Sequence, residues 1–297
     1  MIGRQNTGLI PGEAKHLIER NGIPLLRDDF EIEKNTIHLT GRDGEITDRA
    51  FFAAFSNCSV EAIDVSDYES AEIVHDMSVP IPDHLKGQFD FIYDGSSLDN
   101  IFNVATAMQN VSDLLKPGGR CALMNWSNSF PTAYAMLSPD WFMDFFAYHE
   151  YEDARVLVVA VDAVHGRVWR YGPLVIHDNQ YGYQCSSITT HETRATICFA
   201  EKSDKPTKGG FPVQMHYRGA NVEPYLSSAK RFRTSQRPQY DLSWHGIKTM
   251  QPRAAKEGTE AYSLVFQIVA GPPFSCRFAA EHSSVMMIGL VSSYISR

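Results

Sequence analysis

Short apolar runs alternate with segments of helical periodicity through the first two thirds of the 297-residue chain. This alternation constrains the fold most, because strand–helix–strand units build a mainly parallel sheet covered by helices. The runs with a strand pattern are residues 59–66, 71–77, 89–95, 120–126, 154–163, 168–176 and 195–201. The segments that fit helices are residues 12–22, 47–56, 97–115 and 138–151. We therefore expect an α/β fold.

Two of the predicted helices have clear end signals. Ser138 followed by Pro139 is a typical N-cap and first-turn pair, and the residues Lys116-Pro117-Gly118-Gly119 end the preceding helix. Beyond residue 201 the stretch SDKPTKGG has the composition of a loop, and periodic segments become fewer. We therefore predict an α/β core over residues 1–201 and a C-terminal extension over residues 202–297.

Composition and charge narrow the function classes. The 35 acidic residues outnumber the 27 basic ones, and the net charge of −8 gives no general attraction to nucleic acid. The N-terminus has no apolar leader, and the chain has no uncharged apolar run of the roughly 18 residues that a membrane helix needs. We expect a soluble, cytoplasmic protein with no nucleic-acid or membrane partner.

The spacing of the cysteines and histidines does not predict a metal site. The five cysteines lack CxxC spacing, and three of them fall in apolar, strand-like runs, so we expect reduced core residues. The eleven histidines show no HxH or HExxH pattern. A serine nucleophile is not indicated either, because no G-x-S-x-G elbow occurs.

Acidic residues follow three successive predicted strands. Asp64 follows VEAI, Asp76 follows EIVH, and Asp94 follows FDFIY. Ligands of open α/β sheets bind outside the carboxyl ends of the strands, where carboxylates accept hydrogen bonds from ribose hydroxyls. A single acid at such a position is more often a turn or capping residue. Three of them together favour a nucleoside site.

The stretches VEAIDVSDYESAEIVHD and FDFIYDGSSLDNIFNVATAMQNVSDLLKPGGRCALMNW resemble the middle of a class I S-adenosylmethionine-dependent methyltransferase. The resemblance covers roughly residues 1–201. Its most specific parts are the acid after the second strand, the FDFIYDG strand and the LLKPGG turn. It implies a doubly wound, Rossmann-like sheet with an antiparallel strand near one edge, and S-adenosylmethionine as the cofactor.

The resemblance also implies roles for individual residues. Asp64 takes the position of the acid on the cofactor ribose, Asp76 lies beside the adenine, and Asp94 lies next to the sulfonium. Asn125 and Trp126 line the acceptor side. The complete cofactor-binding set that it implies is Gly3, Asp64, Val65, Asp76, Met77, Asp94, Gly95 and Ser96.

The chain departs from the family pattern at two places. The glycine-rich loop after the first strand is reduced to Ile2-Gly3-Arg4-Gln5, so the first strand is expected to be truncated. Where many relatives have Leu-Glu-His, this chain has Leu98-Asp99-Asn100. Asparagine takes up no proton at neutral pH, so a general base must come from elsewhere. The candidate catalytic residues are Asp94, His149 and Tyr134.

Two functions follow from these residues. The first is a methyltransferase that acts on a small-molecule or sugar-like acceptor. The second is a catalytically inactive, methyltransferase-like binding or assembly protein. A nucleotide-dependent oxidoreductase fits less well, because no G-x-G-x-x-G is present.

Two segments of the extension bear on partners. Residues 227–256 hold seven Lys or Arg against one acid, which suits either an anionic acceptor group or a solvated surface. Residues 260–271 suit an extra strand or a surface between copies of the chain, so a homo-oligomer is possible.

Overall fold

The computed structural model describes residues 1–32, 44–128, 133–162, 167–173, 193–214, 227–228, 232, 249–250 and 266–270. Contacts divide the chain into two compact units. The first unit begins with Met1–Asp76, and the second begins with Met77–Asp162. The predicted boundary near residue 201 lies inside the second unit. Most of the predicted basic segment at 227–256 lies outside the described residues, as does the larger part of 260–271.

The described part of the first unit contains two helices, α1 (Pro11–Arg20) and α2 (Asp48–Ala53), and two short parallel strands, β1 (Ile63–Asp64) and β2 (Ile73–Val74). The Thr47 hydroxyl caps α2 by accepting the Ala50 N–H at 3.1 Å. Ile2 forms a single parallel bridge to Ile63. The expected first strand is thus reduced to one residue pair.

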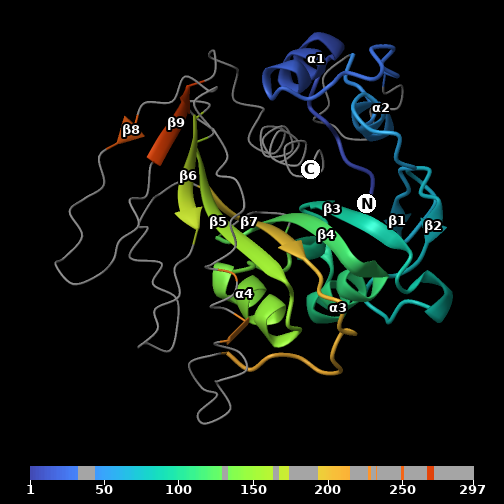
Figure 1. Cartoon of the computed structure of the whole chain (residues 1–297), viewed down its shortest axis with the longest axis vertical. Helices are drawn as coiled ribbons and strands as arrows, with labels where there is room; N and C mark the ends of the chain where they lie inside the picture. Colours follow the sequence, from blue (N-terminus) through green and yellow to red (C-terminus); the bar gives the residue numbers. More distant parts are fainter. Residues whose placement is uncertain are drawn as a thin grey trace. The chain divides into compact units, whose positions relative to one another are not determined.

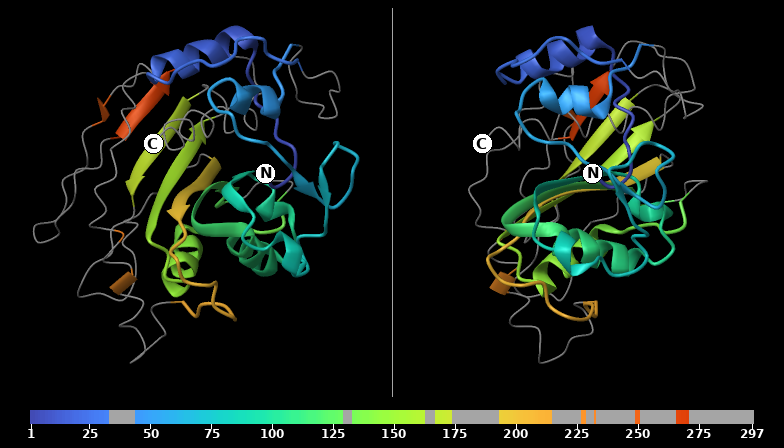
Figure 2. Two further views of the ribbon diagram at one scale, coloured as in Figure 1. Left: turned by 45° about the vertical axis from the view of Figure 1, so that its right-hand side comes forward. Right: turned by 90° about the vertical axis from the view of Figure 1, so that its right-hand side faces the viewer.

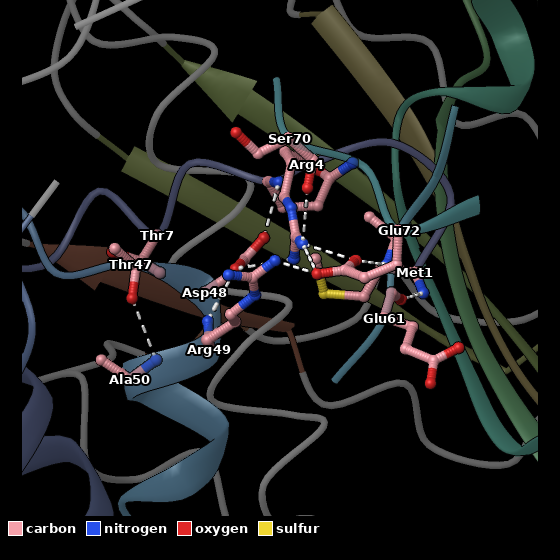
Figure 3. Close-up of polar contacts among 12 residues, drawn as sticks. Met1, Arg4, Thr7, Thr47, Asp48, Arg49, Ala50, Glu61, Ser70 and Glu72 are labelled. Atoms are coloured by element: carbon pink, nitrogen blue, oxygen red, sulfur yellow. Dashed lines mark hydrogen bonds and ion pairs between the residues drawn. The ribbon is translucent and has the colours of Figure 1, made fainter. Parts of the chain in front are cut away.

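Ion pairs join the N-terminal segment to α2 and to Glu72, the residue before β2, as Figure 3 shows. The Arg4 guanidinium contacts the Glu72 carboxylate at 2.5 Å and that of Asp48 at 3.4 Å. Arg49 also pairs with Glu72. Glu72 further accepts the Ala62 N–H at 2.7 Å, so one carboxylate joins three parts of this unit.

The second unit contains a mixed sheet. Within the described residues its strand order is β3-β4-β7-β5-β6-β9-β8. The strands are β3 (Phe89–Gly95), β4 (Leu115–Trp126), β5 (Asp153–Asp162), β6 (Arg167–Pro173), β7 (Thr193–Glu201), β8 (Thr249–Met250) and β9 (Phe266–Ala270). β3 and β4 are parallel, whereas β7 is antiparallel to both β4 and β5.

The prediction of a mainly parallel sheet is therefore wrong for this unit. β5 ends at Asp162 and β6 begins at Arg167. A parallel crossover needs about a dozen or more residues. The connection between β5 and β6 is shorter than that, so these two strands can pair only in the antiparallel direction. The remaining pairs, β6 with β9 and β9 with β8, are also antiparallel.

Two helices connect the strands that run in the same direction. α3 (Val104–Leu114) leads from β3 to β4, and α4 (Pro139–Tyr148) leads from β4 towards β5. Both connections step the same way along the sheet, so right-handed crossovers place both helices on one face. Figure 1 shows them there. Two 3₁₀ turns, η1 (Asp83–Leu85) and η2 (Leu98–Asn100), precede α3.

The core of the second unit lies between the sheet and the helices α3 and α4. Every residue of β4 from Cys121 to Trp126 is buried, which fits a central strand covered on both faces. Phe142 and Phe146 are fully buried on α4, which packs on β5 and β7. No helix in the described ranges is both long enough and apolar enough to cross a lipid bilayer.

The first residues of the predicted extension pack on this core. The segment 202–214 continues from β7 and passes α3 and α4, as both views of Figure 2 show in orange. The Lys202 ammonium donates to the carbonyl oxygens of Ser112 at 2.5 Å and Leu115 at 3.0 Å. The extension thus begins as part of the second unit.

Candidate functional site

Three polar side chains are fully buried where β3 and β4 end. The two strands are in register, with Asp94 opposite Leu123 and Gly95 opposite Met124, so their carboxyl ends lie side by side. Asp94, Asp99 and Asn125 each have 0% exposure there. Buried polar groups need hydrogen-bond partners, and these three residues supply them to one another.

Asp94 organises the turn that follows β3. Its Oδ1 accepts the N–H of Ser97 at 2.8 Å and that of Leu98 at 3.3 Å. Its Oδ2 accepts from the Asn125 side-chain Nδ2 at 2.8 Å. The carboxylate therefore fixes the backbone of residues 95–98 and links it to β4.

Asp99 anchors the same turn from the other side. Its carboxylate accepts the Ser96 hydroxyl at 2.9 Å and the Trp126 N–H at 2.8 Å. Its own N–H donates to Asn125 Oδ1 at 3.0 Å. The two strand ends and η2 are thus held in one hydrogen-bonded network.

Burial sets the electrostatics of this network. It raises the pKa of Asp94 to about 7, and the nearby Asp99 charge acts in the same direction. Burial also raises the pKa of Asp99 to about 6. The N–H donors act in the opposite direction, because they stabilise the ionised form. The pair can therefore hold a proton close to neutral pH.

The outer rim of the turn carries exposed groups. Ser96 has a φ of 86°, a conformation that non-glycine residues seldom adopt. The Asn100 side chain donates to the Ser96 carbonyl at 2.8 Å. Phe102 and Tyr134 are 87% and 73% exposed, and their rings meet edge to face at 6.0 Å. This rim offers backbone polar groups and aromatic surface to a ligand.

The two predicted acceptor residues, Asn125 and Trp126, do not line this rim. Trp126 is 3% exposed, and Asn125 is fully buried with its amide bonded to Asp94 and Asp99. Both belong to β4, whose continuous apolar run is buried on both faces. Their observed role is to hold the turn in place.

The predicted base His149 lies away from Asp94. It caps the carboxyl end of α4, whose ten residues span about 15 Å back from the carboxyl edge of the strands. Its Nδ1 accepts the Lys208 N–H at 3.2 Å. Burial, together with the charges of Lys208 and Lys202, lowers its pKa to about 4. The structure therefore does not bring it together with the turn.

Tyr134, the third candidate base, is next to the site. Its ring is on the exposed rim, and its backbone N–H donates to the Asp99 carbonyl at 2.8 Å.

The remaining predicted cofactor residues belong mainly to the first unit. Asp64 is half-buried at the end of β1 and its Oδ1 accepts the Ser66 N–H at 3.4 Å, while Val65 is 68% exposed. Asp76 is exposed. Gly3 has a φ of 65° and donates its N–H to the Ile63 carbonyl at 2.9 Å. The convergence of these residues with Asp94 stays a prediction.

Met77 begins the second unit. Its side chain is buried at 4% exposure, and its carbonyl accepts from Asn110 Nδ2 at 3.0 Å. It therefore forms part of the core of that unit.

Asp99 is the site residue that the sequence reasoning missed. The signal was its position five residues after Asp94, in the stretch where relatives have Leu-Glu-His. A group of three or more His, Cys, Asp or Glu side chains able to hold a metal ion does not occur in the described part of the chain.

Comparison with known proteins adds no relative. No protein-family model matches the chain, and no curated protein matches it.

Proposed function

We propose that the chain is an S-adenosylmethionine-dependent methyltransferase that acts on a small-molecule or sugar-like acceptor. The observation that carries this proposal is the ordered turn after β3. Asp94 and Asp99 fix the backbone of residues 95–98 at the carboxyl edge of the parallel pair β3 and β4. Open α/β sheets bind ligands at this edge. The methyltransferase resemblance puts the methyl donor at the same residues.

The strand arrangement supports the same proposal. β3, β4 and β5 run in one direction, and the antiparallel strand β7 lies between β4 and β5. The resemblance implies a sheet with such an antiparallel strand near one edge. The helices α3 and α4, which connect the strands running in the same direction, cover one face of it.

The residues of the first unit suit a nucleoside. Asp64 carries one long hydrogen bond of 3.4 Å, so its carboxylate has capacity for the two hydroxyls of a ribose. Val65 beside it is exposed and offers apolar surface. The resemblance assigns Asp64 and Asp76 to the ribose and adenine ends of the cofactor, and Gly95 and Ser96 to its reactive end.

When bound, S-adenosylmethionine supplies an electrophilic methyl group on a sulfonium. The chain's own contribution is mainly positioning, which is worth about 7–11 kcal/mol for well-aligned reactants. Asp94 and Asp99 prevent the turn from moving, because six hydrogen bonds converge on their carboxylates and on Asn125. The exposed rings of Phe102 and Tyr134 give a cation an aromatic surface. Tyr134 is the candidate base that adjoins the rim.

A methyltransferase-like binding protein is the second candidate. It is favoured because the Asp94 and Asp99 carboxylates are used internally and Asn100 cannot act as a base. In that case the turn would hold the nucleoside without transfer of its methyl group.

Calorimetric titration of the full chain with S-adenosylmethionine tests the proposal. We expect saturable binding by the parent chain. Asp64→Ala should lower the affinity by about 10-fold or more, because a hydrogen bond to a charged group contributes about 1.5–3 kcal/mol. Asp67→Ala is the control, since Asp67 is an exposed acid of the same loop. An absence of binding to the parent chain would overturn both candidates.

Labelled methyl transfer to pooled small molecules then separates the two candidates. Binding with turnover supports the enzyme, and binding without turnover supports the binding protein.

A further inference from the structure

Two aromatic rings are largely exposed beside the turn that follows β3. Phe102 is 87% exposed and Tyr134 is 73% exposed. A buried ring stabilises a fold through the apolar area that it removes from water, and an exposed ring contributes little in this way. Single exposed rings are common on protein surfaces, but these two are in contact, with their centroids 6.0 Å apart. The stability of the fold therefore does not explain the pair.

The backbone beneath both rings is held by hydrogen bonds. Asn103, directly after Phe102, donates from its side-chain Nδ2 to the Ser78 carbonyl at 2.9 Å. Tyr134 donates its N–H to the Asp99 carbonyl at 2.8 Å, and the N–H of the next residue donates to the same carbonyl at 3.1 Å. The two rings are thus presented by an ordered backbone, which lowers the entropy lost when a ligand packs on them.

The two ring planes meet at 76°, so the rings form a corner. A planar aromatic molecule in this corner can stack on one ring and present its edge to the other. Both arrangements are favourable, because the negative face of one ring attracts the positive edge of the next. A saturated ring has no such quadrupole and gains only from the area that it buries. The corner therefore favours an aromatic ligand.

The segments that carry the two rings are nearly free of charge. Within residues 95–104 and 133–138 the only side chain that is charged at neutral pH in water is Asp99, which is fully buried and bonded to the turn. A charged ligand would lose part of its hydration without finding an opposite charge on these segments. A neutral ligand is therefore favoured.

We propose that Phe102 and Tyr134 bind the methyl acceptor, and that this acceptor is a neutral small molecule with a planar aromatic ring. The inference rests on the proposed function and narrows its acceptor class. Both rings are fixed to η2, since Phe102 follows it by two residues and Tyr134 is bonded to Asp99 within it. A molecule on the rings would therefore adjoin the turn that the proposed function assigns to the methyl donor.

Calorimetric titration of the full chain with 2-naphthol and with its saturated counterpart decahydro-2-naphthol tests the aromatic preference. We expect 2-naphthol to bind about 5-fold more tightly or better, because only the planar rings interact with the quadrupoles of Phe102 and Tyr134. 2-Naphthoate, which carries a negative charge, should bind more weakly than 2-naphthol. Equal binding of 2-naphthol and its saturated counterpart would overturn the proposal.

Variants locate the binding on the two rings. Phe102→Leu and Tyr134→Leu keep an apolar side chain without a ring, and each should reduce the preference for 2-naphthol to about 2-fold or less. Tyr134→Phe keeps the ring and should keep the preference. Phe211→Leu is the matched control, because Phe211 is a 51% exposed ring that lines a separate pocket beside α4. An effect at Phe211 as large as that at Phe102 would place 2-naphthol in that pocket and contradict the assignment.

The cofactor titration distinguishes failure of this inference from failure of the proposed function. Binding of S-adenosylmethionine without any preference for 2-naphthol would overturn the inference alone. A ring-dependent preference for 2-naphthol in a chain that does not bind S-adenosylmethionine would overturn the proposed function, and with it the role of the two rings as the acceptor site.

Discussion

The side-chain amide of Asn125 donates to the Asp94 carboxylate at 2.8 Å, across 31 residues of sequence. The same amide accepts the Asp99 N–H through its oxygen at 3.0 Å. Because a carboxylate needs a donor and an N–H needs an acceptor, only one orientation of the amide satisfies both neighbours. Asn125 is therefore the link between the end of β4 and the turn that Asp94 organises.

Replacement of Asn125 by alanine should be strongly destabilising. It leaves the Asp94 oxygen and the Asp99 N–H buried without this partner, which should cost about 2–4 kcal/mol of unfolding free energy. Asn100→Ala is the matched control. Asn100 is exposed and makes one side-chain bond, to the Ser96 carbonyl, so the expected loss is about 0.5 kcal/mol. Urea denaturation measures both, and equal losses would show that burial does not set the difference.

The stability of the chain should depend on pH through Asp94. Its folded pKa is about 7, whereas an unfolded aspartate loses its proton near pH 4. Between these values the folded state binds more protons, so the contribution of Asp94 to the unfolding free energy falls as the pH rises. Asp99, with a pKa of about 6, acts in the same direction.

Asp94→Asn removes the ionisable group and should flatten this slope between about pH 4 and pH 7. Urea midpoints of the parent and the variant at several pH values provide the measurement. Asn100→Ala, which changes no ionisable group, should keep the parental slope. If Asp94→Asn has the same pH dependence as the parent chain, the buried carboxyl does not titrate in this range.

The elements with strong local signals could be predicted from the sequence. The strand 89–95 has the predicted bounds, and the helix predicted from Ser138 begins at Pro139, with the Ser138 hydroxyl accepting the Trp141 N–H at 3.2 Å. Strand direction was not predictable from pattern alone, because a buried strand is a continuous apolar run whether its neighbours are parallel or antiparallel. The antiparallel strand β7 illustrates this, since six of its nine residues are buried.

The site was predictable only in part. The exit of β3 was recognised from Asp94, because an acid after an apolar strand is unusual enough to be noticed. Its partners were not, since Asn125 lies inside an apolar run and Asp99 inside a helical pattern. Long-range hydrogen bonds leave no signal in the local sequence. The burial of Asn125 leaves none either, so a residue predicted to contact the acceptor instead supports the turn from inside.

The two glycines of the LLKPGG stretch, which the structure places in the first half of β4, should respond differently to alanine. A Cβ on Gly119 would lie 2.8 Å from the Lys116 carbonyl oxygen and 3.2 Å from that of Phe89, and backbone atoms cannot easily move aside. We expect a loss of about 2–3 kcal/mol. Gly118 has open space but a φ of 73°, so alanine should cost about 1 kcal/mol there.

Gly209→Ala is the control for this series. A Cβ at Gly209 meets nothing within 4 Å, so little change is expected. Thermal or urea unfolding of the three variants should give the order Gly119, Gly118, Gly209. A cost at Gly118 that exceeds the cost at Gly119 would contradict the close approach of the two backbones.

Lys202 and Lys205 test whether the segment after β7 is part of the core. Lys202 is 8% exposed and donates to the Ser112 and Leu115 carbonyls at the end of α3. Lys202→Met should therefore lower the unfolding free energy by about 2–3 kcal/mol, because it leaves these buried acceptors without their donor.

The control is Lys205, which pairs with Glu150 at 3.1 Å but has a side chain that is 51% exposed. Lys205→Met should therefore cost less than about 1 kcal/mol, and high salt should abolish the difference from the parent chain. Methionine keeps most of each apolar stem, so the comparison isolates the ammonium group. A small effect at Lys202 in urea unfolding would mean that the residues directly after β7 do not stabilise α3.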